Sequence, residues 1–388
     1  MQCGHPRLSA FAIGLLALPL SALGASAQLA VSANDSKAVL VDGVNTVPAN
    51  PAGDTVSIVD LNVSPPKLVA EIKAPTSVVG PPSSVAVAPD ESYALVTAAT
   101  KVDPADPKKT APDNKISVID LKTSPPAVVA TVEAGAGAAG VAINRAGNLA
   151  IVANRAEGTL SVFTISGKTL TPAGKIDLGD KAAGPSAVAF TPDGKTALVS
   201  RDGDHKVSVF NVDGNKVEPA KRDINAGLRP YPLDISSRGD IAVVANIGIG
   251  QGDADTASLI DLQAKPPRVV DTVTVGQTPE GLKMSPDGRY VAVTAMNGSN
   301  KPKSSPFFSD NGLVVILDTS GKKLTKVTEG KVGHWCQGAA WSKDGKTLLV
   351  QCMVENELQV FGFDGKTLTP GAPIKVSGGP AGIGTADR

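Results

Sequence analysis

Two histidines are the side chains of this sequence best suited to move a proton near neutral pH. Of the three histidines, His5 lies in an N-terminal segment that we expect to be removed, which leaves His205 and His334. Because an imidazole titrates near neutral pH, either one could act as a general base toward water. The structural alternatives are solvent exposure for His205, in its Asp-Gly-Asp-His-Lys loop, and packing beside Trp335 for His334. Both are candidate catalytic residues.

Six further residues are candidate ligand-binding groups, because we expect all of them on one face of the fold, where strands begin or end. They are Arg155, Arg201, Arg229, Tyr231, Glu280 and Trp335. Several arginines at one mouth could hold a carboxylate or stabilise an oxyanion. Together with a histidine base, they would suit the opening of a lactone. The alternative for each arginine is a solvated salt bridge or one between neighbouring structural units.

Two cysteines flank a predicted hairpin turn symmetrically. Cys336 and Cys352 each lie eight residues from Asp344, so folding the hairpin brings them face to face. In an oxidising compartment such neighbours can form a disulfide, and the alternative is two buried thiols. We predict the disulfide. We predict no metal site, because His334 is the one further soft ligand nearby.

A repeated unit positions these residues. Its clearest copies, residues 185–200 and 279–294, place alternating apolar residues on both sides of a Pro-Asp-Gly turn, a pattern typical of a β-hairpin. Glycine in that turn supplies the positive φ that the turn needs. The first apolar residues of six copies are Val85, Val141, Val188, Leu233, Leu282 and Ala339. Neighbouring copies are therefore 45 to 57 residues apart, a period typical of propeller blades.

Each unit continues with a third and a fourth strand, such as residues 207–212 and 268–275. Seven units of four antiparallel strands predict an all-β fold, a seven-bladed β-propeller. Eight segments match the pattern of a unit's first strand, one more than seven units need, because residues 29–32 and residues 379–385 both fit. We favour the C-terminal segment, since its pairing with the N-terminal blade closes the ring and protects the sheet edges. In the alternative, the N-terminal segment is the first strand of its blade, and the ring closes without pairing between the two ends of the chain.

Three connections are longer than the others, at residues 101–115, 247–256 and 297–312. The third contains the pair Phe307 and Phe308. Long loops on one face of a scaffold usually carry recognition. We therefore expect these loops to contribute to binding, with the two phenylalanines as a docking anchor or as a plug over the central channel.

Strand pairs along the chain resemble a known family of repeats. The pair at residues 94–97 and 116–120 (Ala-Leu-Val-Thr with Ile-Ser-Val-Ile-Asp) and the pair at residues 150–154 and 160–163 resemble YVTN-type repeats, over essentially the whole chain after residue 27. This resemblance implies a seven-bladed propeller related to bacterial surface-layer and periplasmic propellers. More distantly, it implies a relation to the propeller lactonases and carboxymuconate-cyclising enzymes. Because a shared fold does not establish a shared reaction, the resemblance assigns no individual catalytic position.

The first 27 residues have the features of a signal peptide. His5 and Arg7 precede an apolar run at residues 8–20, and Ala25-Ser-Ala27 provides a small-residue cleavage site. We expect cleavage near Ala27, one propeller domain at residues 28–388, and a periplasmic or secreted protein. The apolar run is too short to span a bilayer, and no later segment suits membrane insertion.

Charge and motifs exclude several classes of function. Lys plus Arg and Asp plus Glu number 37 each, so no basic excess indicates nucleic-acid binding. The sequence lacks a nucleophile elbow, a phosphate-binding loop, a zinc-binding histidine pair and a haem-attachment site, so we predict no cofactor. The main hypothesis is a monomeric platform that binds a small anionic molecule, a lactone or another periplasmic protein. The alternative is a lactonase-like hydrolase, or a lactone-forming cyclase, with His and Arg residues in a central funnel.

Overall fold

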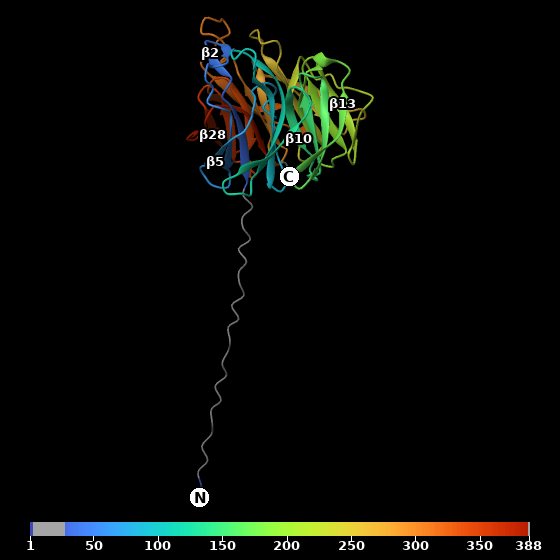
Figure 1. Ribbon diagram of the computed structural model, residues 1–388, viewed down its shortest axis with the longest axis vertical. Coiled ribbons are helices and arrows are strands. Elements are labelled where there is room, and N and C mark those ends of the chain that lie inside the picture. The colour runs from blue at the N-terminus through green and yellow to red at the C-terminus, as the bar shows by residue number, and fades with distance from the viewer. Residues whose placement is uncertain (3–27, 387–388) are drawn as a thin grey trace.

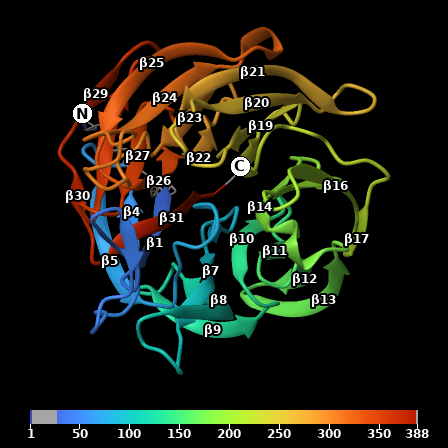
Figure 2. The same cartoon turned by 90° about the horizontal axis from the view of Figure 1, so that it is seen from above.

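The computed structural model describes residues 1–2 and 28–386 and has the predicted seven-bladed β-propeller fold (Figures 1 and 2). The segment assigned to the signal peptide lies almost entirely outside the described residues. The strands of each blade are given from the innermost outward. Blade 1 consists of β31 (Gly379–Thr385), β1 (Leu29–Asp35), β4 (Thr55–Asp60) and β5 (Lys67–Lys73), and blade 2 of β6 (Val85–Val87), β7 (Tyr93–Val102), β8 (Thr110–Asp120) and β9 (Ala127–Glu133). Blade 3 consists of β10 (Ala138–Ile143), β11 (Leu149–Asn154), β12 (Thr159–Ser166) and β13 (Thr169–Asp177), and blade 4 of β14 (Pro185–Phe190), β15 (Thr196–Arg201), β16 (Lys206–Asp213) and β17 (Lys216–Pro219).

The remaining blades follow the same antiparallel order. Blade 5 consists of β18 (Pro230–Ile235), β19 (Ile241–Asn246), β20 (Asp255–Asp261) and β21 (Arg268–Gly276), and blade 6 of β22 (Pro279–Met284), β23 (Tyr290–Ala295), β24 (Gly312–Asp318) and β25 (Thr325–Val332). Blade 7 consists of β26 (Cys336–Trp341), β27 (Thr347–Cys352) and β28 (Glu357–Phe363), and both β29 (Leu368–Pro370) and β30 (Ile374–Lys375) pair with the outer edge of β28. Two 3-10 helices, η1 (Lys181–Ala183) and η2 (Ser320–Lys322), lie in connections. No helix in the described part of the chain is long and apolar enough to cross a membrane.

The turns between first and second strands explain why the repeat is so regular. Gly194, Gly288 and Gly345 have φ of 68°, 66° and 68°, a region that glycine enters without the steric cost of a side chain. In blade 4, the Gly194 N–H donates to the carbonyl of Thr191 at 2.8 Å. The Asp193 carboxylate accepts from the Lys195 N–H at 3.0 Å. The aspartate and the glycine therefore both fix the hairpin, as their types predict.

The C-terminal strand closes the ring, which confirms the favoured alternative. β31 pairs antiparallel with β1 through six residue pairs, from Ala30 with Thr385 to Asp35 with Gly379. Figure 2 shows these two strands side by side. β1 also pairs with β4, so it is the second strand of blade 1 and not the innermost one. Both edges of β1 are thereby covered, and covered edges resist pairing with other chains.

The apolar core lies between neighbouring blades. One cluster, for example, joins Val243 and Leu259 of blade 5 with Val293 and Val315 of blade 6, all at most 2% exposed. Alternate residues of each central strand face the blade on one side or the other, so every blade is packed on both faces. Burial at this density makes the ring a rigid scaffold for its loops.

Two features differ from the expected loops. Residues 101–115 are largely a continuation of the hairpin β7–β8, with Lys101 paired to Ala111 and Val102 to Thr110, so this connection is less irregular than expected. A short hairpin, β2 (Val39–Val41) with β3 (Val44–Thr46), projects from the connection between β1 and β4 (Figure 1). This hairpin was not predicted, because its strands are only three residues long.

Candidate functional site

The loops that carry the candidate residues all open on one face of the ring, which we call the loop face. It is formed by the connections from second to third strands and by the connections from blade to blade. The Asp-Gly turns lie on the opposite face, which we call the turn face. This arrangement follows from the antiparallel order of each blade, because every connection of one kind must leave the sheet at the same end.

Asp202 joins two of the predicted arginines into one cluster on the loop face. The Arg155 guanidinium donates through both terminal nitrogens to the two Asp202 carboxylate oxygens, with Nη2 to Oδ2 at 2.9 Å. Arg229 Nη2 donates to the same Oδ2 at 2.9 Å. Ser186 Oγ donates to Asp202 Oδ1 at 2.8 Å. Although burial alone would raise the pKa of Asp202, hydrogen bonds from Arg155, Arg229 and Ser186 hold it below the usual value.

Glu280 and Tyr231 complete this cluster. Burial raises the pKa of Glu280 to about 8, against the lowering influence of Arg155 and Arg229. The Arg155 guanidinium lies 5.5 Å from the centre of the Tyr231 ring, within the range of a cation–π contact. Burial, followed by the Glu280 charge, also raises the pKa of Tyr231. A carboxyl that titrates near neutral pH beside two permanent cations is a common feature of catalytic sites.

Local backbone structure explains how these side chains reach the same place. Ser186, Tyr231 and Glu280 are each the second residue of an innermost strand, directly after a proline. Each of these strands has a register shift at this point, between its proline and the residue two or three positions later. Such a bulge bends a strand and redirects a side chain. Three consecutive blades thus contribute equivalent positions to one site.

Arg201 does not join the cluster. Its guanidinium donates to the Asp204 carboxylate and to Ser208 Oγ, the latter at 3.2 Å. In the preceding blade, the last residue of the second strand is Asn154. Its side-chain amide donates to Ser161 Oγ, the corresponding serine of the third strand, at 2.9 Å. Arg201 therefore occupies a position whose usual role is to connect the second and third strands.

The two candidate histidines have different hydrogen-bond partners. His205 is exposed, and its Nδ1 accepts a hydrogen bond from the Arg229 backbone N–H at 3.3 Å. In contrast, His334 Nδ1 lies 2.6 Å from Glu355 Oε1, so a carboxylate orients this ring. Of the two, His334 has the arrangement of an oriented general base.

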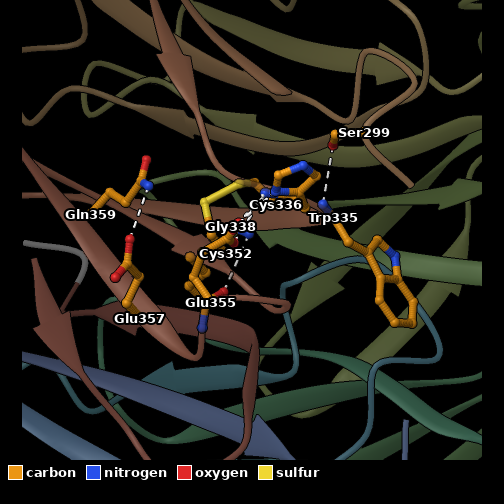
Figure 3. Close-up of a disulfide and its surroundings, with 10 residues drawn as sticks. Ser299, Trp335, Cys336, Gly338, Cys352, Glu355, Glu357 and Gln359 are labelled. Carbon is orange, nitrogen blue, oxygen red and sulfur yellow. Dashed lines mark hydrogen bonds and ion pairs between the residues drawn. A yellow bond between two sulfur atoms is a disulfide. The ribbon is translucent and has the colours of Figure 1, made fainter. Parts of the chain in front are cut away.

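Trp335 belongs to an apolar cluster next to this histidine and is 7% exposed. It packs with Met296 and Met353, and its backbone N–H donates to Ser299 Oγ at 3.1 Å. Figure 3 shows this bond, with the indole directed away from the disulfide. The structure therefore places Trp335 with His334, apart from the cluster around Asp202.

The predicted disulfide is present. Cys336 and Cys352 face each other across β26 and β27, are bonded, and have a Cα–Cα distance of 3.9 Å (Figure 3). Both are fully buried. The bond links the first residue of β26 to the last residue of β27, and thus stabilises the end of blade 7 that carries His334 and Trp335.

Asp202, Ser186 and Glu355 are not among the binding residues predicted from the sequence. Aligning the repeats would have indicated Asp202. It directly follows the second strand of its blade, just as Arg155 directly follows the second strand of the preceding blade. Opposite charges at equivalent positions of neighbouring blades predict an ion pair between those blades. Within residues 28–386, no group of three or more His, Cys, Asp or Glu side chains is arranged to hold a metal.

Comparisons with known proteins agree with this fold. Residues 111–229 match the family model described as lactonase, 7-bladed beta-propeller. This segment covers nearly all of β8 and all of β9 in blade 2, then blades 3 and 4 and the connection to blade 5. It therefore includes Arg155, Asp202 and Arg229. None of the curated proteins matches the chain.

Solved structures with the same fold include the Pseudomonas aeruginosa periplasmic gluconolactonase PpgL, which is 16% identical with a TM-score of 0.66, over 92% of this chain and 98% of that one. A 6-phosphogluconolactonase candidate from Bacteroides fragilis is 18% identical with a TM-score of 0.71, over 94% and 99%. Kuenenia stuttgartiensis hydrazine synthase is 20% identical with a TM-score of 0.61, over 79% and 90%. At these identities the likeness shows the fold alone. The chain is a seven-bladed β-propeller, and part of it is similar to the lactonase family.

Proposed function

We propose that this protein is a lactonase-type hydrolase whose active site is the loop-face cluster of Arg155, Asp202, Arg229, Tyr231 and Glu280. The match to the lactonase family model supports this reaction class, and the matched segment includes three of the five residues. Two of the similar structures carry gluconolactonase or 6-phosphogluconolactonase in their names. The alternative of a lactone hydrolase is thus better supported than the main hypothesis of a binding platform.

The single observation that carries the proposal is the pKa of Glu280 of about 8 beside two arginines. Buried charges and buried carboxyls lower stability unless they are well compensated, so a cluster of this kind is better explained by function than by folding. A general acid or base works best when its pKa lies near the pH of the reaction. Glu280 meets that condition, whereas an ordinary glutamate would be too weak a base.

In the proposed reaction, ionised Glu280 takes a proton from a water molecule while the water oxygen attacks the lactone carbonyl. Arg155 and Arg229 stabilise the negative charge on the carbonyl oxygen. The ring C–O bond then breaks, and the leaving alkoxide receives the proton from Glu280, which returns the carboxylate to its starting state. The products are the hydroxy acid and the unchanged protein. The reverse sequence would form a lactone, the reaction of a cyclase.

The test is acid release by the purified protein on a panel of sugar and aromatic-acid lactones. We expect turnover above the buffer rate, a loss of at least about a hundredfold in Glu280→Gln, and little change in His205→Ala. His334→Ala tests the competing assignment, in which the His334–Glu355 pair supplies the base. Loss of turnover in His334→Ala with retention in Glu280→Gln would move the base to His334. Absence of turnover on every lactone would reject the hydrolase.

A binding platform is the second candidate, because apolar side chains are exposed on the loop face. Leu228 is 47% exposed, Ile249 54% and Phe307 41%. Exposed apolar groups that gather on one face often mark an interaction site. If the platform is correct, a Leu228→Ser/Ile249→Ser variant loses a partner that the wild-type protein captures from a cell extract, and the lactone panel stays inert.

Export is part of the same proposal. We propose that the YVTN-type propeller is released as a monomer at residues 28–388 into the periplasm or the medium, where the Cys336–Cys352 disulfide is stable. N-terminal sequencing of the protein from its natural source tests this, with Gln28 as the expected first residue. A chain that retains residues 1–27 would contradict it.

A further inference from the structure

A cavity of about 210 Å³ fills the central channel on the side of the turn face, away from the loop-face cluster. Its wall contains one aliphatic side chain from each of the seven blades, from Val85 of blade 2 to Ile383 of blade 1. These side chains face the channel, and the seven residues are 3% to 8% exposed. None of the residues that sequence analysis proposed for the functional site lines this cavity.

The size and wall of the cavity set the kind of ligand that would fit. A volume of about 210 Å³ is several times the share of one water molecule, about 30 Å³, but smaller than the pockets of about 300–1,000 Å³ that hold drug-sized ligands. The wall is mixed, because serines such as Ser83 and Ser236 line it beside the seven aliphatic side chains. Where those aliphatic side chains face the channel, displacing water with an alkyl chain is favourable. The channel therefore suits a short aliphatic chain that enters along the axis of the ring.

The rim of the cavity is cationic where it is open. Arg145 and Lys343 are exposed on the turns of blades 3 and 7 and line the cavity. Neither side chain has an ion pair or hydrogen bond within residues 28–386. Two acidic residues also line the cavity, and both have partners within the protein. Glu91 is buried and accepts from the Leu29 N–H at 3.3 Å, and Asp234 accepts from the Ile235 N–H at 2.9 Å and pairs with Lys283 at 3.2 Å. The acids are thus compensated locally, while Arg145 and Lys343 are available to a ligand.

We propose that this channel is a second binding site, distinct from the loop-face cluster, for a small aliphatic carboxylic acid. The alkyl chain lies along the aliphatic wall, and the carboxylate meets Arg145 and Lys343 at the turn face. Charge-assisted hydrogen bonds to an arginine or a lysine are the strong class of such contacts. An alcohol with the same alkyl chain would make the same apolar contacts with the wall but would form no ion pair with Arg145 or Lys343.

The experiment is a calorimetric titration of the purified protein with octanoate and, separately, with 1-octanol. We expect one saturable site for octanoate. The double variant Arg145→Gln/Lys343→Gln should weaken octanoate binding at least about fivefold and leave 1-octanol unchanged. The matched control Lys195→Gln/Lys346→Gln removes the same charge from the same face, outside the cavity lining, and should bind octanoate like the wild type.

A second variant tests the channel wall independently of charge. Ala339 is the one alanine at the wall position where blades 5 and 6 carry leucine, so Ala339→Leu should fill the channel with a side chain that its neighbours already tolerate. We expect it to abolish binding of both octanoate and 1-octanol. The proposal is overturned if no saturable octanoate site exists, if the two double variants bind alike, or if Ala339→Leu binds normally. It is also overturned if Arg229→Gln, on the opposite face, removes the binding.

Discussion

Replacement of Glu280 by glutamine should stabilise the protein at alkaline pH and change little at acid pH. Glutamine has nearly the shape of a protonated glutamate but cannot ionise. The pKa of Glu280 is about 8 in the folded protein, and the ordinary value for glutamate is 4.5. Between these values the folded protein holds a proton that the unfolded chain has released. The stability contributed by this group is therefore lost as the pH rises from about 4.5 to about 8.

The size of the effect follows from the difference between the two pKa values. At about 1.36 kcal/mol for each pH unit, the full difference corresponds to about 5 kcal/mol. The Glu280 side chain is partly exposed, so water stabilises the ionised form to some extent, and about 5 kcal/mol is the upper bound of the effect. Below pH 4.5 the carboxyl is protonated in both states, and the wild type and Glu280→Gln should be about equally stable.

Urea denaturation of the wild type and of Glu280→Gln at pH 5, 7 and 9 measures this effect. Because other groups titrate alike in the two proteins, the difference in free energy of unfolding isolates Glu280. The variant should gain stability over the wild type progressively from pH 5 to pH 9. Curves that run parallel across this range would show that Glu280 has an ordinary pKa, and would remove the observation on which the proposed function rests.

Three further predictions concern the supports of the site and of the ring. Arg155→Ala should lower the free energy of unfolding by about 3 kcal/mol, because the buried Asp202 carboxylate loses one of its two cationic partners. The matched control is Arg155→Lys, which keeps the positive charge. An unchanged urea midpoint in Arg155→Ala would contradict this prediction. Cys336→Ala, which breaks a disulfide between residues 16 apart, should cost about 3 kcal/mol, and reduced wild type should unfold at a similar urea concentration. Deletion of residues 379–388 should expose the edge of β1 and cause aggregation in size-exclusion chromatography, so a soluble monomer would show that the clasp is dispensable.

Local signals made most of the fold predictable. The Pro-Asp-Gly turns fix hairpins through the φ of glycine and the hydrogen bonds of aspartate, and their period reveals the number of blades. The Cys336–Cys352 pairing followed from symmetry about one of these turns. The hairpin at residues 39–46 could not be predicted in this way, since it lies in a single connection and does not recur.

The site was less predictable, because it depends on which side chains meet between blades. Arg155 follows the end of β11 and Arg201 is the last residue of β15, yet only Arg155 reaches Asp202. Arg201 sits one position earlier in the repeat, where its side chain faces the third strand of its own blade. The high pKa of Glu280 depends on burial at a strand bulge, which the sequence shows only as a proline followed by a glutamate.

The pH dependence of kcat/KM for the best lactone of the panel, compared between the wild type and Glu280→Gln, decides whether Glu280 is the base. If Glu280 is the base, the wild-type rate rises with pH and levels off above an apparent pKa of about 8, and this rise disappears in the variant. A lactone hydrolysed with the same pH profile by both proteins, or a wild type without turnover at any pH, would contradict the assignment of the loop-face cluster as a lactonase site.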